Sequence, residues 1–221
     1  MNQLRKLFIF SACFSLVFAN AVATKVVADE TQGETVSADG KVFTNELFDL
    51  SITKPDDWYA QSTQELLQTH QIGANLVSGN NRNLQAVMKE SLKTSLPLFG
   101  FYQYAPGTPT SSNANIAGVA ENVSLYPGIQ KGCDYLYNAK QLMAQSQIRV
   151  EFGDDCLTKN INGSEFGYYN ASIYIGDREI KQKYYACIQD THAISVVQTY
   201  FSPEEEQLVD DVLDTLEVDC N

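Results

Sequence analysis

Histidine, cysteine and acidic side chains are the residues of this sequence that could carry chemistry. It has two histidines, His70 and His192, and His192 follows Cys187 by five residues. A cysteine and a histidine at one turn could form a nucleophile and its base. We expect no catalysis there, because Cys187 is needed for a disulfide and a disulfide sulfur is no thiolate. The patterns G-x-S-x-G and H-E-x-x-H, a phosphate loop and a dinucleotide-binding glycine motif do not occur in the sequence.

Adjacent carboxylates occur at Asp56-Asp57, Asp154-Asp155 and Asp210-Asp211. Such oxygen ligands suit calcium, although none of these pairs has EF-hand spacing. A glycosidase-like hydrolase needs two carboxylates on opposite sides of a cleft. The sequence contains 27 acidic residues and does not indicate which two would form such a pair. Calcium binding and a carboxylate-based hydrolase therefore stay as alternatives. We name no catalytic residue, no metal ligand and no cofactor.

Tyrosine is abundant, and two of the twelve tyrosines flank a long loop. Tyr102 and Tyr104 share one face of a predicted strand, next to the Pro-, Gly- and Ser-containing loop 105–115. A loop of this length is either a binding element or a tolerated insertion. Paired tyrosines can stack on a ligand, and packing within the sheet is the alternative.

Two further tyrosines, Tyr168 and Tyr174, share the face of another predicted strand with Asn170 and Ser172. If Ile173, on the other face, points toward the helices, this Tyr/Asn/Ser face is exposed. Such a face suits contact with a protein or a glycan, whereas a covering helix would make it part of the core. We therefore take Tyr102, Tyr104, Tyr168 and Tyr174 as candidate binding residues.

Residues 1–23 have the pattern of a secretory signal peptide. Arg5 and Lys6 give a positive start, residues 7–18 an apolar run, and residues 21–23 (AVA) a cleavage site. The apolar run is too short for a membrane span, and no later segment approaches about 20 apolar residues. Residues 24–40 are polar and acidic, which predicts a flexible linker before a single domain over residues 41–221. The protein is thus expected to be periplasmic or secreted, with no integral membrane span.

The charge of the chain is strongly acidic. It carries 15 basic and 27 acidic residues, a net charge of −12. The signal removes two basic residues and no acidic one, which leaves −14 for the mature chain. Such a surface repels phosphate backbones, so nucleic acid is excluded as a partner. A basic protein or a divalent cation is compatible with it, as is a solvated surface of a monomer, which is the state we expect.

Four cysteines, Cys133, Cys156, Cys187 and Cys220, remain after Cys13 is removed with the signal. An even number in an exported chain indicates two disulfides, with three possible connectivities. The absence of C-x-x-C spacing argues against a thioredoxin-like redox site and a zinc knuckle.

Hydrophobic periodicity and capping residues predict the elements of the domain. Helices are predicted at 62–71, 83–94, 129–145 and from Pro203, with Ser202 as N-cap and Glu205 completing a capping box. Strands are predicted at 42–44, 47–53, 96–104, 116–123, 148–152, 166–175, 179–188 and 193–201.

This order of elements selects one disulfide pairing. The helix 129–145 runs through a short turn into the strand 148–152, so the two are antiparallel and of similar length, which returns Cys156 to Cys133. The closing helix runs antiparallel to the strand 193–201, which brings Cys220 to the turn near Cys187. We predict the disulfides Cys133–Cys156 and Cys187–Cys220.

The stretch 43–58, FTNELFDLSITKPDDW, resembles the opening of the PsbP/Mog1-like group. In that group a hairpin of the form F-x-N-x-x-x-x-[FL]-S-I-x-K-P-x-x-W leads into an amphipathic helix. Residues 97–106 (PLFGFYQYAP) and 196–218 (VVQTYFSPEEEQLVDDVLDTLEV) are similar to an uncharacterised bacterial exported branch of the group. The resemblance implies an α+β fold, and its motifs concern structure, not catalysis.

We therefore expect an α+β fold: an antiparallel sheet of about seven strands flanked by helices, PsbP/Mog1-like and stapled by disulfides. The expected function is that of a non-enzymatic exported module that binds an unknown protein or small ligand.

Overall fold

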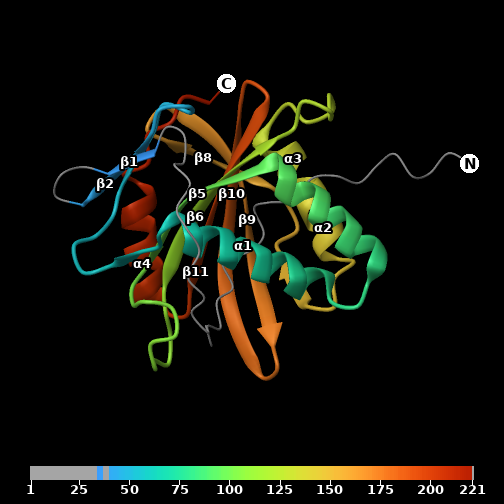
Figure 1. Cartoon of the computed structure of the whole chain (residues 1–221), viewed down its shortest axis with the longest axis horizontal. Helices are drawn as coiled ribbons and strands as arrows, with labels where there is room; N and C mark the ends of the chain where they lie inside the picture. The colour runs from blue at the N-terminus through green and yellow to red at the C-terminus, as the bar shows by residue number, and fades with distance from the viewer. Residues whose placement is uncertain (1–33, 37–39, 221) are drawn as a thin grey trace, which may run out of the picture.

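The computed structural model describes residues 34–36 and 40–220 of the chain. Within these ranges four helices and two antiparallel sheets form three layers (Figure 1). The α+β prediction is confirmed by this architecture. The predicted signal peptide lies outside the described residues, as does most of the predicted linker. Residues 34–36 of that linker form a short strand, β1, which pairs with β2.

The large sheet has eight strands in the order β4-β5-β6-β11-β10-β9-β7, with β8 also paired to β9. Its members are β4 (Tyr59–Ala60), β5 (Ser95–Tyr102), β6 (Asn115–Asn122), β7 (Arg149–Phe152), β8 (Leu157–Ile161), β9 (Ser164–Ile175), β10 (Arg178–Gln189) and β11 (His192–Tyr200). The small sheet contains β1 (Glu34–Val36), β2 (Val42–Asn45) and β3 (Leu50–Thr53).

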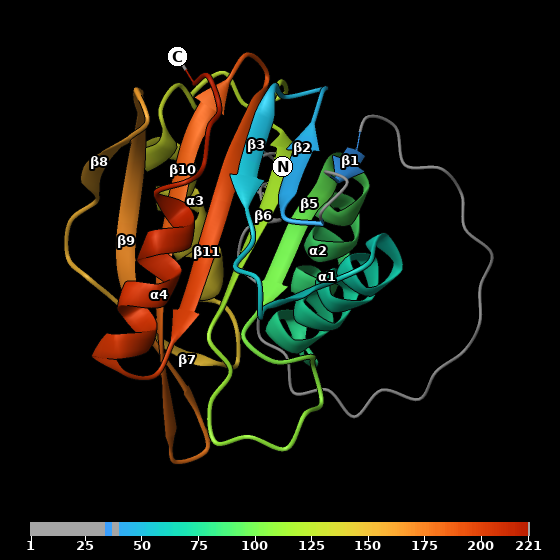
Figure 2. The same ribbon diagram turned by 90° about the vertical axis from the view of Figure 1, so that its left-hand side faces the viewer.

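The helices are α1 (Thr63–Ser78), α2 (Arg82–Thr94), α3 (Gly132–Met143) and α4 (Pro203–Leu213). Figure 2 shows α3 behind the large sheet, α1 and α2 beside β5 at its edge, and α4 with the β2–β3 hairpin in front of it. Each side of the sheet carries its own apolar cluster, one packed under α1–α3 and one under α4 and the hairpin. The sheet is therefore covered on both sides over most of its area.

Helix α1 continues to Ser78, well past the predicted end at residue 71. Its buried side continues at helical spacing through Gly73, Ala74 and Val77, so packing maintains the helix despite the glycine. The helix ends at Gly79, whose positive φ of 46° allows a turn. Its start is as predicted, because Ser62 and Glu65 form a capping box.

The start of α4 differs from the prediction in one hydrogen bond. The Ser202 hydroxyl accepts from the Glu205 amide as an N-cap should, at 3.3 Å. The Glu205 carboxylate, however, accepts from the Phe201 amide at 2.8 Å, one residue before the cap. Glu205 also accepts from the Ser112 hydroxyl at 2.5 Å, which ties the loop before β6 to this helix.

Strand β8 is absent from the predicted elements, because its side chains are mostly exposed and show no apolar alternation. It forms a hairpin with β9 through Asn162 and Gly163, both with positive φ.

His70 corrects a second expectation. A histidine among the polar residues of a predicted helix is expected from the sequence alone to be exposed, yet His70 is 7 % exposed within α1. The buried side of α1 runs through Leu66, His70 and Ala74 at helical spacing, so His70 lies on the side that packs against the protein.

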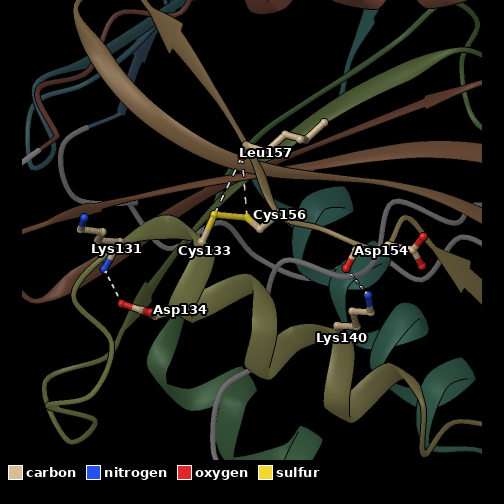
Figure 3. The surroundings of a disulfide bond; sticks show 7 residues. All are labelled: Lys131, Cys133, Asp134, Lys140, Asp154, Cys156 and Leu157. Carbon is tan, nitrogen blue, oxygen red and sulfur yellow. Dashed lines mark hydrogen bonds between the residues drawn. A yellow bond between two sulfur atoms is a disulfide. The ribbon is translucent and has the colours of Figure 1, made fainter.

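Both predicted disulfides are present. Cys133 at the start of α3 is bonded to Cys156 just before β8, and Cys187 of β10 to Cys220 near the end of the chain. Figure 3 shows the first of these, with both sulfur atoms near the carbonyl of Leu157. Each bond joins a helical or terminal segment to the large sheet.

Among the helices of residues 40–220, none is both long enough and apolar enough to cross a membrane.

Burial lowers the pKa of His192 at the β10–β11 turn, and nearby Asp190 offsets part of that effect. The imidazolium is thus less favourable in the folded chain than in the unfolded chain. Below pH 6.5 the unfolded state binds the extra proton, so stability falls as the pH drops through that value. We expect a His192→Gln variant to lose less stability than wild type between pH 7.5 and 5.5, by less than about 1 kcal/mol. Urea denaturation at the two pH values measures this, and parallel losses in both proteins would contradict it.

Candidate interaction surface

Strands β9 and β10 are each twelve residues long and present one face that lies beside α4. Side chains alternate between the faces of a strand, so Tyr168 and Tyr174 share one face of β9. The opposite face carries Tyr169, Ala171 and Ile173, which are buried in the cluster under α3. The predicted sidedness of this strand is therefore confirmed.

Helix α4 covers part of this face and is held there by Lys183 of β10. Its ammonium lies 2.8 Å from Glu206 and 2.9 Å from Asp210 of the helix. Burial lowers the pKa of Lys183, but the hydrogen bonds to Glu206 and Asp210 outweigh it and the net shift is upward. Beside it, burial raises the pKa of Tyr200 to about 12, with a further contribution from Glu206. The acidic side of α4 is thus partly neutralised by the sheet, and is not wholly solvated.

Tyr168 lies at the border of the part that α4 covers. It is half-buried and stacks on Tyr185, with ring centroids 5.2 Å apart and planes 25° from parallel. Leu157 of β8 pairs with it across the strands and is 47 % exposed. Tyr168 therefore combines a fixed ring with an exposed apolar neighbour.

Tyr174 lies farther along β9, opposite Arg149 of β7. The guanidinium stands over its ring, 4.3 Å from the centroid, and the tyrosine hydroxyl donates to Glu151 at 3.2 Å. Arg149 also forms an ion pair with Glu151. Desolvation, and then Glu151, raise the pKa of Tyr174, so its hydroxyl stays protonated at neutral pH. The three side chains hold one another in place on the surface.

We call the part of the sheet that α4 does not cover the outer sheet face. Its members are exposed or half-buried residues of β7, β9 and β10: Arg149, Glu151, Tyr168, Asn170, Ser172, Tyr174, Glu179 and Lys181. Charges of both signs alternate with aromatic and amide groups. Because each side chain stands on a paired strand, the arrangement is rigid.

Tyr102 and Tyr104 do not form a pair on one exposed face. Tyr102 ends β5 and is 1 % exposed, whereas Tyr104 lies beyond the strand and is 44 % exposed. The backbone of Tyr104 is hydrogen bonded instead to the side chain of Asn113. The strand was predicted to end at residue 104, but β5 ends two residues earlier, at Tyr102. The hydrogen bonds between Tyr104 and Asn113 belong to the loop that follows. Tyr102 is therefore a core residue and offers no surface for a ligand.

The adjacent acids have separate surroundings. Asp56 forms an ion pair with Lys41 at 2.7 Å, and Asp210 binds Lys183. Over the described part of the chain, no three His, Cys, Asp or Glu side chains are grouped so that they could hold a metal ion.

Arg149 and Lys181 belong to the outer sheet face but were not among the predicted binding residues. The alternation of Arg149 with Val150 in the sequence indicates that Arg149 is exposed. Its place over Tyr174 depends on β7 pairing with β9, which local sequence does not specify.

Comparisons with known proteins give similarities to solved structures. No family model and no curated protein match the chain. Among solved structures, it is similar to cyanobacterial PsbP (CyanoP) from Synechocystis sp. PCC 6803, with 9 % identity and a TM-score of 0.49, over 89 % of this chain and 98 % of that one.

Two other solved structures are similar at lower scores. One is LpqN of Mycobacterium tuberculosis, described as involved in cell envelope biogenesis, with 12 % identity, a TM-score of 0.43, and coverage of 84 % of this chain and 88 % of LpqN. The other is a Bacteroides thetaiotaomicron protein with 14 % identity and a TM-score of 0.40, and coverage of 86 % of this chain and 49 % of that one.

Proposed function

We propose that this chain is an exported, non-enzymatic module that binds a protein partner through the outer sheet face. The observation that carries the proposal is the fixed Tyr174–Arg149 pair on an exposed strand face. Tyrosine and arginine are the side chains most enriched at protein interfaces and among the residues that dominate binding energy. Held in one orientation, they lose little conformational entropy on binding.

The charges of the face support a protein partner with polar groups of both signs. Arg149 and Lys181 alternate there with Glu151 and Glu179. A surface of one sign would instead favour a polyelectrolyte. Tyr168, with Leu157 beside it, adds apolar surface at the border with α4. A polar rim around aromatic side chains is the usual composition of a transient interface.

Export is part of the proposal and rests on two observations. The first is the signal pattern of residues 1–23. The second is the pair of disulfides, which form and persist in oxidising compartments outside the cytosol.

The test begins with a photo-crosslinking amino acid placed at Asn170, an exposed residue of the outer sheet face, in the mature protein, so that Tyr174 stays intact. After incubation with native envelope extract, crosslinked proteins are identified and the main one is purified. We expect Tyr174→Ala to weaken binding of that protein by at least tenfold, as is common for a central interface residue. Arg149→Ala is expected to have a similar effect, measured by titration calorimetry.

Tyr137→Ala provides the matched control. Tyr137 is 56 % exposed on α3, on the opposite side of the sheet, so its removal is expected to leave the affinity unchanged. Equal effects of the Tyr174 and Tyr137 substitutions would contradict the proposal. So would a crosslinker at Asn170 that captures only glycan.

A further inference from the structure

A pocket of about 290 Å³ lies away from the outer sheet face, where the start of α1 meets β2 and β5. Its apolar lining comes from three elements and includes three aromatic rings: Phe43, Leu66, Leu98, Phe99 and Phe101. The rings of Phe43 and Phe99 are 5.9 Å apart, and those of Phe99 and Phe101 are stacked at 5.2 Å. Rings fixed by mutual contact give a preformed apolar site, which is typical of small-molecule pockets.

The cations beside this pocket already have hydrogen-bond or ion-pair partners. Lys41 forms an ion pair with Asp56 at 2.7 Å. Lys54 donates to the carbonyls of Pro55 and Trp58, both at 2.8 Å. The N-terminus of α1 is likewise compensated, since Glu65 accepts from the Ser62 amide at 2.8 Å. These cations and the N-terminus of α1 are therefore engaged by groups of the protein itself.

The lining also contains a hydrogen-bond acceptor without a donor in the described part of the chain, the side-chain oxygen of Gln61. Gln61 donates through its amide nitrogen to Thr69 at 2.7 Å. Its amide oxygen is buried and has no hydrogen-bond partner among the described residues. A buried acceptor without a donor costs free energy, which a ligand bearing an N–H or O–H would recover.

Gly100 makes room for this oxygen. A Cβ at position 100 would lie 2.5 Å from the Gln61 amide oxygen and 2.9 Å from Leu66. The backbone carbonyl of Gly100 also accepts a hydrogen bond from the backbone N–H of Gln61 at 2.9 Å. This bond fixes the two residues relative to each other. Glycine here maintains the space around the acceptor.

From this geometry we propose that the pocket binds a small uncharged molecule with an aromatic or aliphatic body and one hydrogen-bond donor. The apolar rings take the body, and Gln61 accepts from the donor. The volume is roughly twice the ~150 Å³ of a cavity that holds benzene, which corresponds to a two-ring compound. This site is independent of the proposed partner surface.

The test uses 2-naphthol and 2-methylnaphthalene, which have nearly the same shape and differ in the donor. Each is titrated into the ¹⁵N-labelled mature protein while the amide resonances of Gln61, Ser62, Gly100 and Phe101 are followed. We expect saturable shifts at these residues and about tenfold tighter binding of 2-naphthol, the effect of one hydrogen bond. In Gln61→Met, which keeps the length of the side chain but lacks the acceptor, the two affinities are expected to become equal.

Gly100→Ala is expected to reduce binding of both compounds. Its control is Gly153→Ala, where the new Cβ would make only an ordinary contact of 3.6 Å, and which should bind like wild type. If Gly100→Ala fails to fold, the affinity ratio in Gln61→Met decides alone. Equal affinities of the two compounds in wild type, or shifts absent from the pocket, would overturn the proposal.

Discussion

Gly132→Ala is expected to destabilise the protein by about 3 kcal/mol, the upper range for overpacking of a well-packed core. Gly132 is the first residue of α3, and a Cβ there would lie 1.8 Å from the carbonyl oxygen of Ala186 in β10. Neither partner can rotate away, because the contact is with backbone. Alanine would favour the helix by up to about 1 kcal/mol, which is too little to offset the clash. Urea denaturation measures the difference.

The control for this substitution is Gly128→Ala, in the segment just before α3. A Cβ at Gly128 would meet nothing within 4 Å, so we expect a change within about 0.5 kcal/mol. Gly167→Ala tests the same contact from the sheet, since its Cβ would lie 2.7 Å from the Cys133 amide nitrogen. A Gly132→Ala protein as stable as Gly128→Ala would show that α3 is not seated against the strands.

Removing the Cys187–Cys220 disulfide is the second change with a large expected effect. The double variant Cys187→Ala/Cys220→Ala should lose about 3–4 kcal/mol of stability, the chain-entropy value for a separation of 33 residues. The loss should be concentrated at the end of the chain. There Glu217 exchanges two backbone hydrogen bonds with Ser51 of β3, at 2.9 and 2.8 Å. Hydrogen exchange at those two amides should become faster than at the strands of the large sheet.

Cys133→Ala/Cys156→Ala is the matched variant. Its separation of 23 residues predicts a similar total loss, but its local effect should appear at α3 and not at Ser51 and Glu217. The two variants thus separate global from local stabilisation. If neither changes the exchange at Ser51, the disulfide does not hold the terminal segment in place.

Local sequence signals correctly predicted the elements that begin or end at clear capping and turn residues. The capping residues Ser62 and Ser202 mark the true starts of two helices, because a cap is a contact between near neighbours in sequence. The Gly176-containing turn between β9 and β10 is likewise local, since its positive φ suits glycine. The disulfide pairing followed from the antiparallel return of neighbouring elements, which is also short-range.

Errors occurred where burial depends on distant partners. His70 and the second half of α1 are buried by elements that come later in the chain. Strand β8 is set by pairing with β9, and its exposed side chains carry no hydrophobic period. Tyr102 was expected to be accessible because it lies next to a loop in the sequence. It is buried in the structure, where its strand is paired with β4 on one side and β6 on the other.

For the candidate binding surface too, one part could be predicted from local sequence and another part could not. Alternation within β9 determined that Tyr168 and Tyr174 lie on one face opposite Ile173, because strand geometry depends only on sequence spacing. Whether a helix would cover that face was decided by tertiary structure. Helix α4 packs against β11, β6 and β3 and is tied to β10 by Lys183, which leaves β7 and the far half of β9 open.

The sequence by itself determined the fold class, the disulfide pairs and the sidedness of the strand that carries the tyrosines, since periodicity, capping and short connections are local properties. Only the tertiary structure placed Arg149 over Tyr174 and gathered Phe43, Gln61 and Gly100 around one pocket. These contacts join residues from separate strands and connections. Their geometry is fixed by strand pairing and layer packing, which depend on the whole chain at once.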